Sequence, residues 1–172
     1  MRIKINIILV LVLLSSCTDV VFEVPQPTYL KNIENIPNKF HGSFTAEMGV
    51  DYTICQNYFL RDDDTLHVGS ENLILKYQGN KLYVNFKEVD SDFYELFTLS
   101  RFNYFGADSL FVNYVRRPDV NFIDYKQNYM QVNNIRYSEI ADEHILIKDS
   151  LTVNQINTFL NWSNSRHFLF TD

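Results

Sequence analysis

Residues 72–87 read NLILKYQGNKLYVNFK, and this stretch decides the fold class. Apolar residues recur at every second position on both sides of Gly79-Asn80. A Gly-Asn pair between two alternating segments favours a two-residue hairpin turn. Such a turn pairs Gln78 with Lys81 and, further along the ladder, Leu73 with Phe86. The turn chemistry and the alternating pattern therefore predict the same hairpin and the same register.

The predicted register places six apolar residues on one face of the hairpin. They are Leu73, Leu75, Tyr77, Leu82, Val84 and Phe86. The opposite face carries Lys76 and Asn85 but also Ile74 and Tyr83, so we expect it to be partly covered by another part of the chain.

Alternating segments continue on both sides of this hairpin. We expect strands at Gly42–Glu47, Tyr52–Leu60, Asp64–Val68, Phe93–Phe105, Asp108–Tyr114, Tyr129–Tyr137 and Glu143–Lys148. Several of them follow an Asp, Asn or Glu turn residue, and no fixed long period is present. The fold class is therefore mainly β: an antiparallel meander that closes or curls into a barrel.

The pattern changes near the carboxyl end of the chain. Thr152 and Gln155 have the spacing of a capping box, and Leu151 and Ile156 can form a hydrophobic staple around it. Apolar residues then follow helical spacing, which predicts one C-terminal α-helix over Val153–Trp162. A short final strand is expected at His167–Phe170.

The start of the chain has the pattern of an export signal. Arg2 and Lys4 precede an apolar run at Ile7–Leu14, which is too short to span a membrane but fits a signal peptide. Leu14-Ser15-Ser16-Cys17 then resembles the lipobox of bacterial lipoproteins. The resemblance implies lipidation of Cys17, cleavage before it, and acylation of the new amino group with palmitate or a similar chain.

Three segments follow from this interpretation: a signal peptide at 1–16, a lipid-anchored Pro-rich tether at 17–39, and a single β domain at 40–172. Val21 and Phe22 are apolar residues inside the tether that can dock on the domain. The expected location is the cell envelope, with the outer membrane favoured.

The composition limits the classes of partner that the protein is expected to bind. Removing residues 1–16 takes away two basic residues and no acidic residue, so the net charge changes from −6 to −8. An acidic domain without a basic cluster argues against nucleic acid and against electrostatic adhesion to anionic lipid. The expected partners are the membrane, through the lipid on Cys17, and a protein or a small apolar ligand. No cofactor is predicted.

No motif assigns a catalytic or metal site. The histidines, His41, His67, His144 and His167, lack the close spacing of metal ligands. Asp62-Asp63-Asp64 lacks the pattern of a calcium loop. Cys55 lies in a predicted strand, where a free cysteine usually acts as a small buried hydrophobe. Paired carboxylates such as Asp90 and Asp92 offer acid–base chemistry, but a solvated loop is the favoured interpretation.

One type of modification is suggested by a short sequence pattern. Thr65, Ser109 and Ser150 each stand between an aspartate and a leucine, which resembles a bacterial O-glycosylation sequon. The same triplets are ordinary turn and strand-start chemistry, and that interpretation is favoured.

The order of strands, helix and final strand resembles lipocalin-type barrels. Gly42-Ser43-Phe44 is similar to the Gly-x-Trp signature of that family, with Phe in place of Trp, and Asp124-Tyr125 is similar to a second family motif. The resemblance implies a carrier of small apolar ligands. The function expected first is nonetheless a binding or interaction module of the envelope, with a lipocalin-like carrier and a hydrolytic enzyme that uses rim carboxylates as alternatives.

Overall fold

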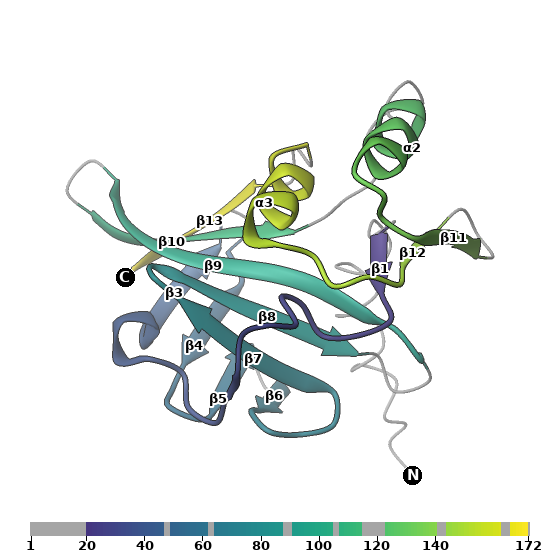
Figure 1. Cartoon of the computed structure of the whole chain (residues 1–172). Coiled ribbons are helices and arrows are strands. Elements are labelled where there is room, and N and C mark those ends of the chain that lie inside the picture. Colours follow the sequence, from purple (N-terminus) through teal and green to yellow (C-terminus); the bar gives the residue numbers. More distant parts are fainter. Residues whose placement is uncertain are drawn as a thin grey trace, which may run out of the picture.

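The computed structural model describes most of the chain from Val20 to Thr171. The described residues are 20–46, 49–61, 64–87, 91–104, 107–114, 123–140, 144–162 and 166–171. Within them the strands form one sheet, which is accompanied by two α-helices and a short 3-10 helix (Figure 1). The strands are β1 (Val20–Phe22), β2 (Asn32–Ile33), β3 (Gly42–Ala46), β4 (Asp51–Ile54), β5 (Tyr58–Arg61), β6 (Asp64–His67), β7 (Leu73–Gln78), β8 (Lys81–Lys87), β9 (Tyr94–Tyr104), β10 (Ala107–Tyr114), β11 (Tyr137–Ile140), β12 (His144–Ile147) and β13 (Arg166–Thr171). The helices are η1 (Asn38–Phe40), α2 (Ile123–Val132) and α3 (Val153–Trp162).

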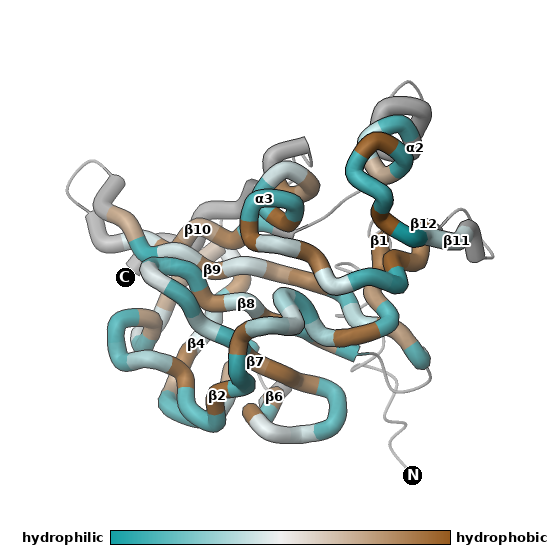
Figure 2. The backbone as a smooth tube through the Cα atoms, viewed as in Figure 1, coloured by the Kyte–Doolittle hydropathy of each residue, from teal (hydrophilic) through white to brown (hydrophobic). Residues whose placement is uncertain are grey.

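The hairpin predicted from residues 72–87 is confirmed as β7 and β8. Leu73 pairs with Phe86 and Gln78 pairs with Lys81, which is the predicted register. Gly79 has a φ of 62°, a conformation that glycine adopts without a steric penalty. Hydrophobic positions recur along β7, and hydrophilic residues gather in the turns that connect the strands (Figure 2).

The long strand β9 is the branch point of the sheet. One of its edges pairs with β8 over residues 94–100. Its other edge pairs first with β1, at Tyr94, and then with β10 from Phe97 onward. The sheet continues from β10 through β13, β3, β4 and β5 to β6, from β8 through β7 to β2, and from β1 through β12 to β11.

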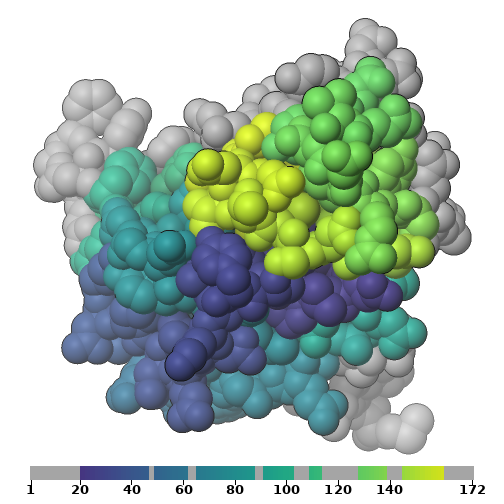
Figure 3. Space-filling model, in the orientation of Figure 1, coloured from purple at the N-terminus to yellow at the C-terminus, as the bar shows by residue number. Residues whose placement is uncertain are grey.

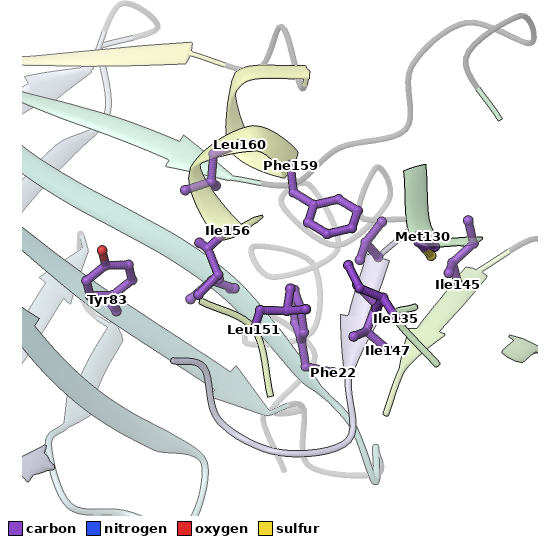
Figure 4. Close-up of a cluster of buried hydrophobic side chains, with 12 residues drawn as sticks. Phe22, Tyr83, Met130, Ile135, Ile145, Ile147, Leu151, Ile156, Phe159 and Leu160 are labelled. Carbon is purple, nitrogen blue, oxygen red and sulfur yellow. The ribbon is translucent and has the colours of Figure 1, made fainter. Parts of the chain in front are cut away.

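Two buried cores lie on the two sides of this sheet. The sheet-side core is enclosed where β3 and β4 curl toward β7 and β8, and it contains Ile36, Phe40, Phe44, Ile54, Leu73, Leu75, Leu82, Val84, Phe86, Leu99 and Leu110. The helix-side core lies under α2 and α3 (Figure 4). Its members are Val20, Phe22, Tyr83, Leu96, Met130, Ile135, Ile145, Ile147, Leu151, Ile156, Phe159 and Leu160.

The mainly β class is confirmed, and of the two expected alternatives, a meander that closes or one that curls, the closed barrel is not formed by the described strands. The strand order ends at β6, at β2 and at β11, and among the described residues no pairing joins these ends. A hydrogen bond between two loops joins the β2 and β4–β5 parts of the sheet instead. The amide of Ile36, which follows β2, donates to the carbonyl of Gln56 in the β4–β5 turn at 2.7 Å. The sheet is also not a pure antiparallel meander, because β1 and β12 are parallel.

The segment predicted to be a tether is part of the folded unit from Val20 onward. Residues 20–22 form β1, which lies between β12 and β9 and is buried. Asn32 and Ile33 pair with β7, and Ile36 lies in the sheet-side core. The docking of Val21 and Phe22 is therefore much more extensive than a transient contact, because a central β position satisfies their backbone groups and buries their side chains. Residues 1–19, including Cys17, lie outside the described residues.

The strand expected at Tyr52–Leu60 is wrong, because it is two strands. β4 and β5 form a hairpin in which Ile54 pairs with Phe59. Cys55 opens the turn between them, where its amide donates to the Tyr58 carbonyl at 3.0 Å. The Cys55 side chain is half-buried and forms no disulfide with another described residue.

The strand expected at Tyr129–Tyr137 is also wrong. Its first part is the end of α2, and only Tyr137 begins a strand, so the chain has a second helix besides the predicted one. The helix ends in a Schellman motif. The Ile135 amide donates to the Met130 carbonyl at 2.8 Å, the Asn134 amide donates to the Gln131 carbonyl at 3.1 Å, and Asn134 has a φ of 54°. Met130 and Ile135 bury their side chains in the same core, so these apolar residues of the segment pack at a helix end and not in a strand.

The C-terminal helix is confirmed with the predicted bounds, Val153–Trp162. The capping box is present. The Gln155 amide donates to Thr152 Oγ1 at 3.2 Å, and the Thr152 amide donates to Gln155 Oε1 at 2.8 Å. Leu151 and Ile156 both lie in the helix-side core, as the staple requires. The final strand is confirmed as β13, which pairs with β10 and β3.

Candidate functional site

A polar cluster lies on the covered face of the β7–β8 hairpin. The N-terminal strap, residues 23–31, crosses this face between the hairpin and the two helices (Figure 3). Asn85 of β8 receives a hydrogen bond from the Gln26 amide at 2.6 Å and donates to the Gln26 carbonyl at 2.8 Å. The Asn85 side chain therefore pairs with the strap in the way that a neighbouring strand would.

The side chain of Gln26 extends the cluster to the start of α3. Its Nε2 donates to the Asp149 carbonyl at 3.0 Å, and its Oε1 accepts from the Leu151 amide at 3.0 Å. Gln26 and Asn85 are both fully buried, and such groups are costly to bury without partners. These hydrogen bonds connect the strap to the hairpin and to the start of α3.

Two titratable residues lie beside this cluster. Lys76 is 5% exposed and its Nζ donates to the Pro27 carbonyl at 2.9 Å. Burial lowers the pKa of Lys76. Tyr83, its cross-strand partner, is 1% exposed, and burial together with the nearby Tyr29 raises its pKa to about 12. A buried lysine with a lowered pKa suits nucleophilic chemistry, but the strap covers it from solvent, so the arrangement favours a structural role.

The predicted lipidation site lies just outside the described chain. Cys17 precedes Val20 by three residues, and Val20 is 0% exposed in the centre of the sheet. The described fold therefore begins three residues after Cys17.

The three candidate glycosylation residues differ in accessibility. Thr65 is exposed on β6. Ser109 is 0% exposed within β10, which argues against its modification in the folded protein. Ser150 is exposed, and its hydroxyl contacts the Thr28 hydroxyl of the strap.

Two of the four histidines have described side chains, and they make separate contacts. His41 Nε2 lies 2.8 Å from the Ile36 carbonyl, and the His67 ring lies beside Tyr58. The side chains of His144 and His167 lie outside the described part of the structure. Within the described ranges no group of three or more His, Cys, Asp or Glu residues has metal-binding geometry. Asp92 is exposed, whereas Asp62, Asp63 and Asp90 lie outside the described residues.

The sequence showed Asn85 on the second face of the hairpin, but it did not indicate a partner. Gln26 gave no signal because a glutamine between two prolines is typical of a linker. The contact joins residues 59 positions apart, and no local pattern encodes such a pairing.

No family model matches this chain, and searches of curated proteins and of solved structures found no significant match. In the part of the chain that the structure describes, no helix has the length and apolar character to cross a membrane.

Proposed function

We propose that this chain is an exported lipoprotein that a lipid on Cys17 holds at a membrane of the cell envelope, the outer membrane being favoured. The observation that carries the proposal is the complete lipobox Leu14-Ser15-Ser16-Cys17 after a short apolar run. The position of the folded unit supports it, because β1 begins three residues after Cys17 and a signal peptide ending at residue 16 leaves the described fold intact.

At the membrane, the domain acts as a binding or interaction module. The packing of the interior supports this function over that of a lipocalin-like carrier. A carrier needs room for an apolar ligand inside the curled sheet. That space is instead occupied by side chains of the sheet-side core, including Phe40, Phe44 and Leu110, each at most 1% exposed.

The enzyme alternative receives little support from the described residues. Its predicted participants were carboxylates at the rim, and Asp92, the described one, is exposed and has no neighbouring metal cluster. The buried Lys76 and Tyr83 lie under the strap rather than in a cleft that the chain leaves open.

Labelling with an alkyne-tagged fatty acid in growing bacteria tests the anchor. The wild-type chain and Cys55→Ser, a matched control that removes the other cysteine, are expected to incorporate the label. Cys17→Ser is expected to incorporate none, because a hydroxyl replaces the thiol that receives the diacylglycerol. Labelling of Cys17→Ser, or its absence from wild type, would contradict the proposal.

Native extraction in detergent tests the binding role. The expected result is a protein partner in a fixed ratio to this chain after crosslinking in intact cells. An apolar small molecule released by organic solvent would favour the carrier, and turnover of an envelope substrate that requires a carboxylate of this chain would favour the enzyme.

A further inference from the structure

The short distance between Cys17 and the folded unit fixes how close the domain lies to the bilayer. This step rests on the proposed lipid anchor. Three residues span at most about 10–11 Å when fully extended. Val20 is itself 0% exposed, so part of this length is used to reach the molecular surface. The domain therefore has no spacer and must contact the lipid headgroups near β1.

The end of α2 lies close to the start of β1. Val20 shares the helix-side core with Met130 and Ile135, which come from the last turn of α2 and from the segment after it (Figure 4). α2 stands next to β1 in the fold (Figure 1). The surface around the carboxyl end of α2 is thus within reach of the anchored residue.

That surface carries a patch of uncharged side chains, which is followed by the exposed Arg136, the partner of Asp149. The amide patch consists of the exposed side chains Asn128, Gln131, Val132, Asn133 and Asn134. Val132 is 81% exposed, the largest value among the exposed large hydrophobic residues of the described chain. The Schellman motif holds the patch in place, because it buries Met130 and Ile135 and turns the residues between them outward.

The amide patch differs in charge from the chain as a whole. Without residues 1–16 the chain carries a net charge of −8, and the anionic surface of a bilayer repels acidic proteins. A patch of amides avoids this repulsion and can donate hydrogen bonds to phosphate and ester oxygens, while an exposed valine can enter the interfacial region. We propose that the amide patch is the surface on which the domain rests against the bilayer that holds the Cys17 lipid.

The proposal is tested with the full-length lipidated protein in vesicles of bacterial phospholipids that contain a headgroup nitroxide lipid. A fluorophore is attached to Val132→Cys in the Cys55→Ser background, and the matched control carries it at Thr65→Cys, an exposed residue of β6. The expected result is severalfold stronger quenching at position 132 than at 65. Insertion of a Gly/Ser linker of about 30 residues, which spans about 30 Å, between Asp19 and Val20 should abolish the difference while the protein still floats with the vesicles.

The possible failures are distinguishable. Flotation with equal quenching at the two positions, or with stronger quenching at position 65, overturns the amide patch and leaves the anchor intact. In another outcome, the label at position 132 is shielded from solvent but is not quenched by lipid, and the protein has the mass of a dimer. The patch then contacts a second copy of this chain, and the proposal is overturned. A protein purified from membranes that bears no lipid and does not float overturns the proposed function itself.

Discussion

The Asn85 side-chain amide hydrogen-bonds both main-chain groups of Gln26, at 2.6 and 2.8 Å, across 59 positions of the sequence. This pairing fixes the N-terminal strap to the central hairpin. It also keeps the segment that follows the predicted anchor inside the fold, so the contact contributes to stability and, under the proposed anchoring, keeps the domain close to the membrane.

Asn85→Ala is expected to destabilise the protein by about 2–4 kcal/mol, because it leaves the Gln26 amide and carbonyl buried without their partner. Urea unfolding measures the change. Asn32→Ala is the matched control, since Asn32 is an exposed residue of β2, and it should change stability by about 0.5 kcal/mol or less. Equal effects of the two substitutions would mean that the strap is not held by this contact.

Thr152→Ala is expected to cost about 1 kcal/mol, because the Gln155 amide loses the hydroxyl that caps α3. Thermal or urea unfolding provides the measurement. Asn154→Ala, within the first turn of the same helix, keeps the capping box and serves as control. If Thr152→Ala left the free energy of unfolding unchanged, the hydrophobic staple and the buried face of α3 alone would hold the start of the helix.

Asp149 should make the stability of the protein depend on pH in the acidic range. Its pKa is lowered, chiefly by the hydrogen bond from the Arg136 amide and further by the Arg136 side chain. A carboxyl group with a lowered folded pKa stabilises the fold above its unfolded pKa of about 3.9, and this contribution is lost as pH falls through the folded value. Asp149→Asn should therefore cost about 0.5–1 kcal/mol near neutrality and nothing at low pH, since the Arg136 side chain is exposed and solvent screens the pair.

Comparison of the urea midpoints of wild type and Asp149→Asn over an acid series checks this prediction. Asp92→Asn, at an exposed carboxylate, is the control. A difference between wild type and Asp149→Asn that persists unchanged to the lowest pH would contradict the assignment.

Tyr83 should contribute to alkaline unfolding. Its pKa is raised to about 12 from 10.0, so its stabilising contribution is present below pH 10 and is lost as pH rises toward 12. Tyr83→Phe should weaken this alkaline loss of stability. The measurement is urea unfolding across that range, with Tyr129→Phe as control because Tyr129 is only half-buried. Identical alkaline profiles for wild type and Tyr83→Phe would show that Tyr83 ionises freely.

Local signals predicted the hairpin and the C-terminal helix well. Gly79-Asn80 sets the register of β7 and β8, and Thr152 with Gln155 sets the start of α3, because both act over a few residues. The signal for the end of α2 was present as Asn134 before Ile135, but the aromatic and apolar residues of 129–137 favoured a strand.

The remaining features depend on contacts between distant segments. The insertion of β1 between β12 and β9, the branching at β9 and the failure of the sheet to close are set by tertiary packing, which a single sequence does not display. For the same reason Ser109 matched a modification pattern although its side chain is buried. The proposed anchor at Cys17 is different, because a lipobox is a local pattern that sequence alone displays.

Mass spectrometry of the N-terminal peptide from membrane-extracted protein is the decisive test of the lipid anchor. We expect a chain that begins at Cys17, with a diacylglycerol on the sulfur and a fatty acyl group on the amino nitrogen. A mature chain that begins at another residue and carries no lipid would contradict both the anchor and the placement of the domain against the bilayer.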